Sequence, residues 1–519
     1  MIPHWTRKTL ALGETQRFIL LAILIGIFSG LLVVCFHIAI DVLSWYSVGA
    51  LSAKLRFGRL IAPAAGAVIA MLLVKYVFPA ARGSGVNQTK AALYISDGVV
   101  PFSTVAGKFL ACSISIGSGN SLGPEDPSLQ MGAGVASLLG RIFHLGRKHM
   151  RMIAPIGAAA GIAAAFNTPI TGVLFVMEEV IVSWSAGVVG SIVLSAVSAV
   201  VVVRWFLGNE PLFRVPVFAM AQPGELLVYA AIGVAGGLFS ALFVKLIENL
   251  RKRLEKLPHR TELIQVLISG ILVGLAGLWL PQVMGAGYDA IDFALHGQFT
   301  WNLLLVLAGV KLLVTLFGFG TGVPGGMFAP TLFVGAMLGG GLGGLAHQYA
   351  PFHTSPVGAY VLVGMGTFFA GVFRAPMSSI FMVFETSANY VIILPVMIAN
   401  TISYLISRKL HPVPFFTMLA RQEGIDLPSA EEYRSMELLH VEDAMRPVPQ
   451  SATLDLAPVI YPDVTLDAAM QLLATHPLLC VANRNEPSKP IGVLSLEDVH
   501  HAYGFEDQPR ELEAEKVRP

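Results

Sequence analysis

The chain contains one unusual segment twice. Lys108 precedes a Gly-Pro-Glu-Asp-Pro run at 123–127, and Lys311 precedes a Gly-Met-Phe-Ala-Pro run at 326–330. The offset is 203 residues for the two lysines and also for the first glycines of the two runs. Internal duplication in a chain that is 55% hydrophobic indicates two membrane halves with a binding site between them.

A second repeated pair follows each copy. Residues 166–169 read Phe-Asn-Thr-Pro and precede Glu178, whereas residues 373–376 read Phe-Arg-Ala-Pro and precede Glu385. The offset is 207 residues, and the proline-to-glutamate spacing is nine both times. This symmetry predicts a shared structural role for Glu178 and Glu385. It leaves Glu179, which points about 100° away from Glu178 on a helix, as the freer carboxylate that meets water.

The apolar blocks predict an all-α polytopic membrane protein. Charged residues make up only 13% of the chain, and residues 18–35 include none, a length that can span a bilayer core. Further spans follow this first block, which argues against a signal peptide. Glycine and proline interrupt many blocks, a pattern that indicates short or discontinuous helices. The other apolar blocks are 59–79, 153–177, 187–203, 225–243, 262–280, 302–318, 357–373 and 376–407.

The distribution of basic residues predicts the orientation. They cluster before the first span (Arg7, Lys8, Arg17), at 251–260, and after the last span (Arg408, Lys409). By the positive-inside rule these places are cytoplasmic, so we expect both termini inside the cell and the protein in the inner (cell) membrane. If each half crosses the membrane an odd number of times, the second half is inverted relative to the first. We expect no nucleic-acid partner, and the three cysteines show no metal or disulfide spacing.

Composition divides the chain into four parts. Residues 1–17 are a cytoplasmic segment, and residues 18–421 are the membrane domain, with halves at 18–207 and 222–421. Residues 438–505 read as a small α/β domain, with a helix at 464–473 and strands at 478–482 and 490–494. The charged residues 506–519 are predicted to be disordered.

The repeated runs predict two helix N-termini aimed at one point. Proline favours the first helical turn, so one helix is expected to start at Asp126 or Pro127 and another near Pro330. Glu125 and Phe328 then lie at the helix mouths. Free backbone N–H groups at two such termini form an anion site without a full positive charge. Ser84, between two glycines ahead of a further helix, adds a hydroxyl donor.

These residues closely resemble the CLC chloride channel and transporter family over nearly the whole membrane region. Residues 83–87, Gly-Ser-Gly-Val-Asn, are similar to the family's first anion-binding motif. Residues 123–127 resemble its second motif, usually written G(K/R)EGP, and residues 326–330 match its third, GxFxP. The resemblance implies two inverted halves and a homodimer with one pore per subunit.

The resemblance also implies a role for each matching residue. Ser84 would donate a hydrogen bond to the central anion, with Gly85 beside it, and Glu125 would be the external gating glutamate. The backbone N–H groups of Met327 and Phe328 would line the same site. Glu179 would match the internal proton glutamate that marks the family's exchangers.

Three departures from the family pattern stand out. Asp126 replaces a usual glycine; we interpret it as a helix N-cap, with the alternative that an ionised, unpaired Asp126 weakens anion occupancy. Pro124 replaces a usual basic residue. Phe415 takes the place of the inner-gate tyrosine and lacks its hydroxyl.

The tail resembles one CBS module. Residues 492–498 are similar to the segment whose serine and aspartate contact a nucleotide ribose, which are Ser495 and Asp498 here. CBS modules work in pairs, so two copies would pair across a homodimer. A structural or degenerate module is the favoured interpretation, and we expect no cofactor.

The leading hypothesis is a proton-coupled chloride antiporter whose substrates are chloride and protons. The alternative is a passive voltage- or pH-gated chloride channel that keeps Glu125 only as a gate. Fluoride transport is disfavoured because fluoride relatives usually replace the serine that Ser84 matches, and nitrate transport is a further minor alternative. An enzyme is disfavoured because no nucleophile arrangement or HExxH metal spacing occurs.

Overall fold

The computed structural model describes residues 14–50, 58–181, 186–213, 215–216, 222–351, 353–425, 427, 439–448, 457–486 and 489–503. It divides into two units, Met1–Leu427 and Pro428–Pro519. Residues 1–13 of the predicted segment 1–17 and the whole predicted disordered tail 506–519 lie outside the described residues.

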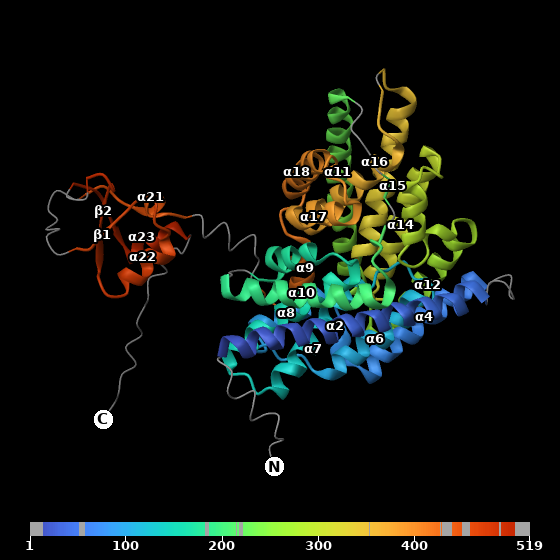
Figure 1. Ribbon diagram of the computed structural model, residues 1–519, viewed down its shortest axis with the longest axis horizontal. Coiled ribbons are helices and arrows are strands. Elements are labelled where there is room, and N and C mark those ends of the chain that lie inside the picture. The colour runs from blue at the N-terminus through green and yellow to red at the C-terminus, as the bar shows by residue number, and fades with distance from the viewer. Residues whose placement is uncertain are drawn as a thin grey trace, which may run out of the picture. The chain divides into compact units, whose positions relative to one another are not determined.

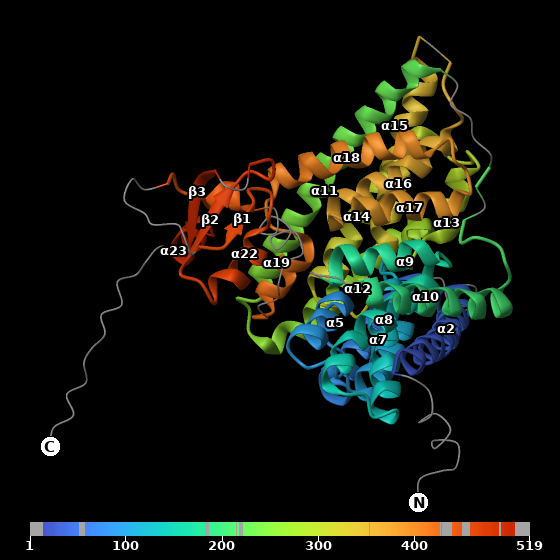
Figure 2. The ribbon, with the colours of Figure 1, turned by 60° about the vertical axis from the view of Figure 1, so that its left-hand side comes forward.

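The first unit consists of helices (Figures 1 and 2). Short π or 3-10 segments, among them η4 (Val176–Val180), join several of them. The α-helices are α2 (Glu14–Ser44), α4 (Gly58–Leu72), α5 (Gly85–Tyr94), α6 (Phe102–Gly117), α7 (Glu125–Ile142), α8 (Arg147–Phe166), α9 (Pro169–Phe175), α10 (Ala186–Leu207), α11 (Leu226–Leu254), α12 (Glu262–Trp279), α13 (Tyr288–Leu295), α14 (Trp301–Gly320), α15 (Phe328–Tyr349), α16 (Val357–Phe373), α17 (Pro376–Ser387), α18 (Ile393–Leu410) and α19 (Phe415–Gln422).

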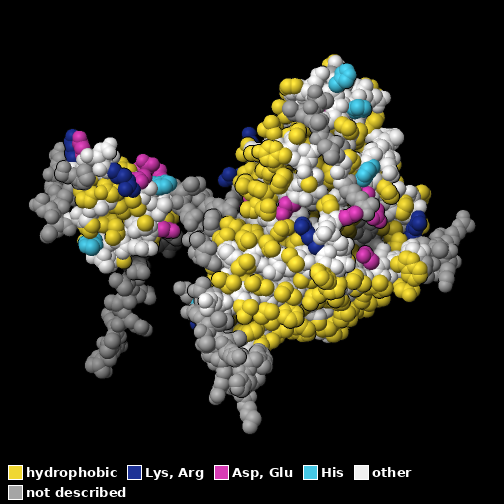
Figure 3. Space-filling view, viewed as in Figure 1, with side chains coloured by type: hydrophobic (Ala, Val, Ile, Leu, Met, Phe, Trp, Pro, Cys, Tyr) yellow, Lys and Arg dark blue, Asp and Glu magenta, His cyan; other side chains and the backbone are white. Residues whose placement is uncertain are grey.

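Eight helices of the described residues are long and apolar enough to cross a membrane. The spans in α8 and α15 are buried for most of their length, whereas those in α10 and α12 expose more than half of theirs. Hydrophobic side chains cover much of the visible face of this unit (Figure 3). Such a surface belongs in lipid, so the protein is a multi-pass membrane protein, as predicted.

Helices end at repeat-equivalent positions in the two halves. α8 ends before Asn167 and α16 ends before Arg374, and these two C-cap residues have left-handed φ values of 57° and 58°. A helix cannot continue through that conformation, and proline then starts α9 at Pro169 and α17 at Pro376. The predicted block 153–177 therefore contains parts of two helices, α8 and α9. The predicted block 376–407 also contains two helices, α17 and α18, because α17 ends before Ala388, whose φ is 50°.

Glu178 and Glu385 each cap a helix in the opposite half of the chain. The Glu178 carboxylate accepts hydrogen bonds from the backbone nitrogens of Met377 and Ser378, at 3.0 and 2.7 Å, where α17 begins. The Glu385 carboxylate accepts from Ile170 and Thr171, at 2.9 and 2.7 Å, where α9 begins. Anions stabilise helix N-termini, so the two glutamates do share one structural role.

Glycines at repeat-equivalent positions let the central helices approach closely. A Cβ atom on Gly132 of α7 would clash with the backbone oxygen of Gly157 in α8. A Cβ atom on Gly335 of α15 would likewise clash with the oxygen of Gly364 in α16, and it would lie 2.7 Å from the Cβ atom of Phe368. Both helix pairs therefore require glycine for backbone contact.

The second unit is a small α/β fold. Its three strands, β1 (Val459–Ile460), β2 (Leu478–Ala482) and β3 (Pro490–Ser495), form a sheet in the order β1-β2-β3. β1 and β2 are parallel, and β2 and β3 are antiparallel. Its helices are α21 (Val441–Ala444), α22 (Leu466–Leu473) and α23 (Leu496–Ala502). Leu466, Leu479, Leu494 and Val499 are fully buried in its core.

We predict that Gly335→Ala destabilises the protein by about 1–3 kcal/mol, because a methyl group is forced into a backbone contact. Gly309→Ala is the matched control, since nothing lies within 4 Å of the added Cβ atom in the helix α14. Thermal unfolding of detergent-purified protein, followed by intrinsic fluorescence, measures both. Equal thermal midpoints for the two variants would contradict the packing argument.

Glu385→Gln should lower stability by about 1 kcal/mol, because the α9 N-terminus loses its negative charge and one acceptor. Glu255→Gln removes a charge from the exposed residue that follows α11 and serves as the control. The same thermal measurement applies. A midpoint for Glu385→Gln that matches the control would show that the cap contributes nothing.

Candidate functional site

The two repeated runs meet through their backbones. Gly123 and Gly326 form an antiparallel bridge in which each nitrogen donates to the other's oxygen at 2.8 Å. The helix α7 starts two residues after Gly123, and α15 starts two residues after Gly326. The bridge therefore places the two helix N-termini side by side. The predicted helix start at Asp126 or Pro127 is corrected to Glu125.

Glu125 reaches the N-terminus of α15. Its side chain is fully buried, and its carboxylate accepts a hydrogen bond from the backbone nitrogen of Ala329 at 3.3 Å. The hydroxyl of Tyr288, at the start of α13, also donates to it. The gating candidate thus contacts the first turn of α15, the helix that begins at Phe328.

Asp126 reaches a different helix. Its carboxylate accepts a hydrogen bond from the backbone nitrogen of Val86 at 2.9 Å, and the Ser84 hydroxyl lies 3.4 and 3.5 Å from its two oxygens. Ser84 is the N-cap of α5 but forms no side-chain cap of its own. The prediction that Asp126 caps its own helix is wrong, because the side chain caps α5 instead.

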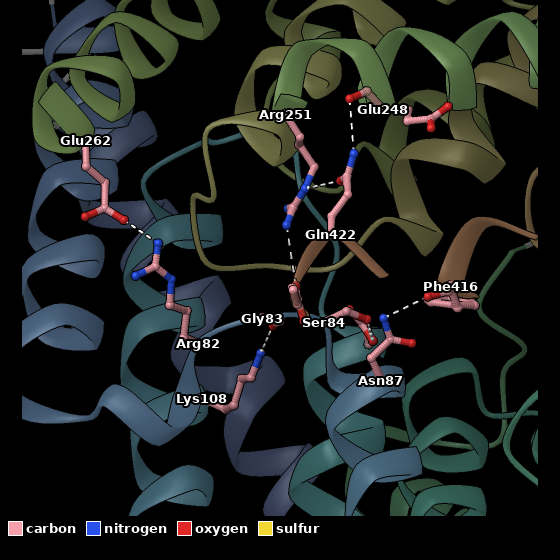
Figure 4. A network of polar contacts seen from close by, with 12 residues as sticks. Arg82, Gly83, Ser84, Asn87, Lys108, Glu248, Arg251, Glu262, Phe416 and Gln422 are labelled. Atoms are coloured by element: carbon pink, nitrogen blue, oxygen red, sulfur yellow. Dashed lines mark hydrogen bonds and ion pairs between the residues drawn. The ribbon is translucent and has the colours of Figure 1, made fainter. Parts of the chain in front are cut away.

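Repeat-equivalent lysines hold the loops beside these carboxylates. Lys108 donates to the backbone oxygen of Gly83 at 2.6 Å, a contact shown in Figure 4. Lys311 donates to the oxygen of Gly285 at 2.6 Å and to that of Val283 at 3.0 Å. A glycine-x-glycine run, 83–85 in the first half and 285–287 in the second, starts at each tethered glycine.

Sequence reasoning missed Tyr288 and this second loop. The loops are offset by 202 residues, and each precedes its lysine by a similar interval. This repeated spacing is the sequence pattern from which the second loop could have been predicted. The loop at 285–287 leads into α13 as the loop at 83–85 leads into α5, so Tyr288 is the counterpart of Val86.

Phe328 and Phe415 belong to one aromatic cluster. Both rings contact the ring of Phe373, with centroid separations of 4.7 and 5.6 Å. Phe415 starts α19 and is buried. A phenylalanine ring offers no hydroxyl donor. Met327 immediately precedes α15, and Gly85 is the first residue of α5, so the predicted anion-site residues all lie at helix starts.

Glu179 has a partner that the sequence did not reveal. It lies in η4, is buried, and forms an ion pair with Lys90 of α5. The expectation that Glu179 is the freer carboxylate is therefore wrong. Lys90 follows Val86 by about one helical turn, so α5 holds Asp126 at its start and Glu179 one turn later.

Further charged residues lie around the loop at 83–85 that leads into α5. Arg251 donates to Gln422 at 3.0 Å, and Arg82 donates to Glu262 at 2.5 Å (Figure 4). Arg251 also lies 3.5 Å from Glu423, whose carboxylate approaches Gly83. The field of these groups acts on any ion near Ser84.

The nucleotide-contact candidates in the tail take part in local bonds. Ser495 and Asp498 form a capping box at the start of α23, with the Ser495 nitrogen donating to Asp498 at 2.8 Å. Arg446 forms an ion pair with Asp498. Both side chains therefore have a structural function in this unit.

The chain has extensive similarity to known proteins. The family described as "Voltage gated chloride channel" matches residues 66–408. A putative chloride channel protein ClcB-like of Ralstonia nicotianae is 33% identical over 393 residues, 74% of this chain and 91% of that protein. The H(+)/Cl(-) exchange transporter ClcA of Vibrio campbellii is 30% identical over 411 residues, 77% of this chain and 88% of that protein.

Solved structures share the fold. A slow cyanobacterial Cl-/H+ antiporter superposes with a TM-score of 0.70 at 24% identity, over 79% of this chain and 98% of that one. A CLC-type fluoride/proton antiporter gives a TM-score of 0.66 at 23% identity, over 78% and 98%. Because the family match and the relatives extend over the repeated runs, the chain belongs to the voltage gated chloride channel (CLC) family.

Proposed function

We propose that this protein exchanges chloride for protons across a membrane. The observation that carries the proposal is that the N-termini of α5 and α15, one from each repeat, each hold a buried carboxylate. Helix termini that hold a carboxylate by backbone dipoles can also hold a chloride ion. The exchange activity of the ClcA relative supports this substrate pair.

The residue roles follow from these positions. Chloride binds at the helix starts, with the Ser84 hydroxyl, the loop at Gly85 and the backbone of Met327 and Phe328 around it. Glu125 leaves the α15 N-terminus when it takes up a proton, because a neutral carboxyl group is attracted less strongly to the positive end of the dipole. Phe415 is the inner steric closure.

Proton transfer is assigned to Glu125 and Glu179, the carboxylates that the family pattern marks. The buried Lys90–Glu179 ion pair favours the alternative of a passive chloride channel, because a paired carboxylate resists protonation. For exchange, protonation of Glu179 must accompany loss of this pair. A transport assay distinguishes the two functions.

A homodimer is the assembly we propose. Ile170 and Met377, at the starts of α9 and α17, are 43% and 49% exposed, beside the half-buried carboxylates Glu385 and Glu178. Carboxylates facing lipid are costly. A second copy that covers this face removes the cost. The inner cell membrane and cytoplasmic termini are the proposed location and orientation, from the basic clusters.

For the tail we propose a CBS-like module with a structural role. The three-stranded sheet with α22 and α23 supports this assignment. A nucleotide that used Ser495 and Asp498 would first have to displace Arg446 from Asp498.

Removal of the Glu179 carboxylate should stop proton flux and leave chloride flux. Glu179→Gln alone leaves Lys90 buried without its anion, so the paired Lys90→Met/Glu179→Gln variant is the better test. Purified protein in liposomes is given a chloride gradient, and proton movement is read with a pH electrode. Wild-type protein should drive protons uphill, and the paired variant should move chloride alone.

Glu178→Gln is the matched control, since Glu178 is the adjacent carboxylate and caps α17. Its proton coupling should persist. Chloride flux without proton movement in the wild-type protein would establish the channel instead. Absence of chloride flux in the wild-type protein would end the proposed function in both forms.

Ile170→Trp with Met377→Trp should convert the dimer into monomers, because the bulky rings prevent close approach of the second copy. Leu238→Trp is the control for a lipid-facing position, because Leu238 of α11 is also 49% exposed. Light scattering in detergent gives the protein mass. A wild-type monomer, or a dimer that tolerates both substitutions, contradicts this interface.

A further inference from the structure

Asp126 occupies the positions that a bound anion would take at α5. Its carboxylate is 3% exposed and accepts the Val86 N–H at 2.9 Å. The Ser84 hydroxyl, the donor that family resemblance assigns to chloride, lies 3.4 Å from one oxygen and 3.5 Å from the other. A carboxylate and a chloride ion cannot accept these donors at the same time.

Neutral dipoles provide the direct contacts to this carboxylate. Among the described residues Asp126 forms no ion pair, and its direct donors are the hydroxyl and backbone groups at residues 84–86. Lys108 attracts it through space but donates its hydrogen bond to Gly83. A negative charge held by dipoles can exchange with a small anion more readily than one fixed in an ion pair.

The neighbouring carboxylate does not compete for the same donors. Glu125 accepts from Ala329 and Tyr288, which belong to the second half of the chain. Two consecutive acidic residues are therefore divided between two helix N-termini, and only Asp126 contacts α5. Capping of its own helix cannot explain Asp126, because its bonds leave α7.

We propose that Asp126 is a tethered anion, which competes with chloride for the N-terminus of α5 and sets the affinity of that site. The inference rests on the proposed chloride transport. Chloride binds there after the carboxylate has moved off Ser84 and Val86. The chain would thus have two internal competitors, Glu125 at α15 and Asp126 at α5, where the family pattern has one.

Surrounding charges make the exchange feasible. The carboxylate of the adjacent residue Glu125 repels that of Asp126, whereas Lys108 attracts it. The long Ser84 contacts are weaker than a hydrogen bond of ordinary length. The Val86 N–H, at 2.9 Å, is the contact of ordinary hydrogen-bond length.

Chloride binding by two variants tests the proposal. Asp126→Asn keeps an acceptor for Val86 but removes the charge, and Asp126→Gly removes the competitor and restores the residue usual in the family. The detergent-purified full-length chain is titrated with chloride in an isothermal calorimeter. We expect wild type to bind chloride most weakly, Asp126→Asn more tightly, and Asp126→Gly most tightly. We expect Asp126→Gly to bind at least about tenfold more tightly than wild type.

Asp97→Asn is the control, because it is the same chemical change at a half-exposed residue that pairs with Arg147. Its chloride affinity should equal that of wild type. Thermal midpoints measured with and without chloride give a second readout, since a ligand that binds the folded state raises stability. The increase in thermal midpoint on adding chloride should be larger in both Asp126 variants than in wild type.

Two results would overturn the proposal. If both Asp126 variants have lower thermal midpoints and unchanged chloride affinity, Asp126 is only a cap for α5, although the wild-type protein still transports chloride. If the wild-type protein neither transports chloride in liposomes nor binds it, and the variants do not bind it either, the proposed function fails together with this inference.

Discussion

The backbone bridge between Gly123 and Gly326 is the contact on which the site depends. It is formed by two hydrogen bonds of 2.8 Å between repeat-equivalent residues, and it runs antiparallel. Because α7 and α15 begin two residues beyond it, their first turns are fixed relative to each other. A Cβ atom on Gly326 would lie 2.7 Å from the Cβ atom of Asp126, so the bridge also requires glycine there. The position of Glu125 beside the first turn of α15 follows from this approach.

Buried charge in this protein is distributed in two ways. Glu125 and Asp126 are held mainly by hydroxyl groups and backbone N–H groups, whereas Glu179 is held by the ammonium group of Lys90. Desolvation is costly for all three, but only the ion pair places an opposite full charge in contact with the carboxylate. Glu125 and Asp126 are therefore suited to exchange with a mobile anion, whereas Glu179 is suited to a fixed position. Any proton path through Glu179 must account for Lys90.

The repeats made much of this arrangement predictable. Offsets of 203 and 207 residues indicated that Glu125 and Phe328 share a region and that Glu178 and Glu385 share a role. A one-dimensional pattern could not reveal which side chain reaches which helix. Asp126 was assigned to its own helix because capping rules are local, whereas its actual partner, Val86, lies 40 residues away. Lys90 and Tyr288 were missed because they belong to no recognised motif and their partners, Glu179 and Glu125, lie 89 and 163 residues away.

The reciprocal glutamate caps have a consequence for synthesis. The first turn of α9 is complete only when Glu385 reaches it, and α9 starts at Pro169. A ribosome must therefore add more than 200 further residues after α9 emerges before that helix has its acceptor. During this interval the first half holds exposed backbone donors inside or near lipid, where water does not replace the missing acceptor. The first half therefore reaches its final hydrogen bonding only after the second half has been translated.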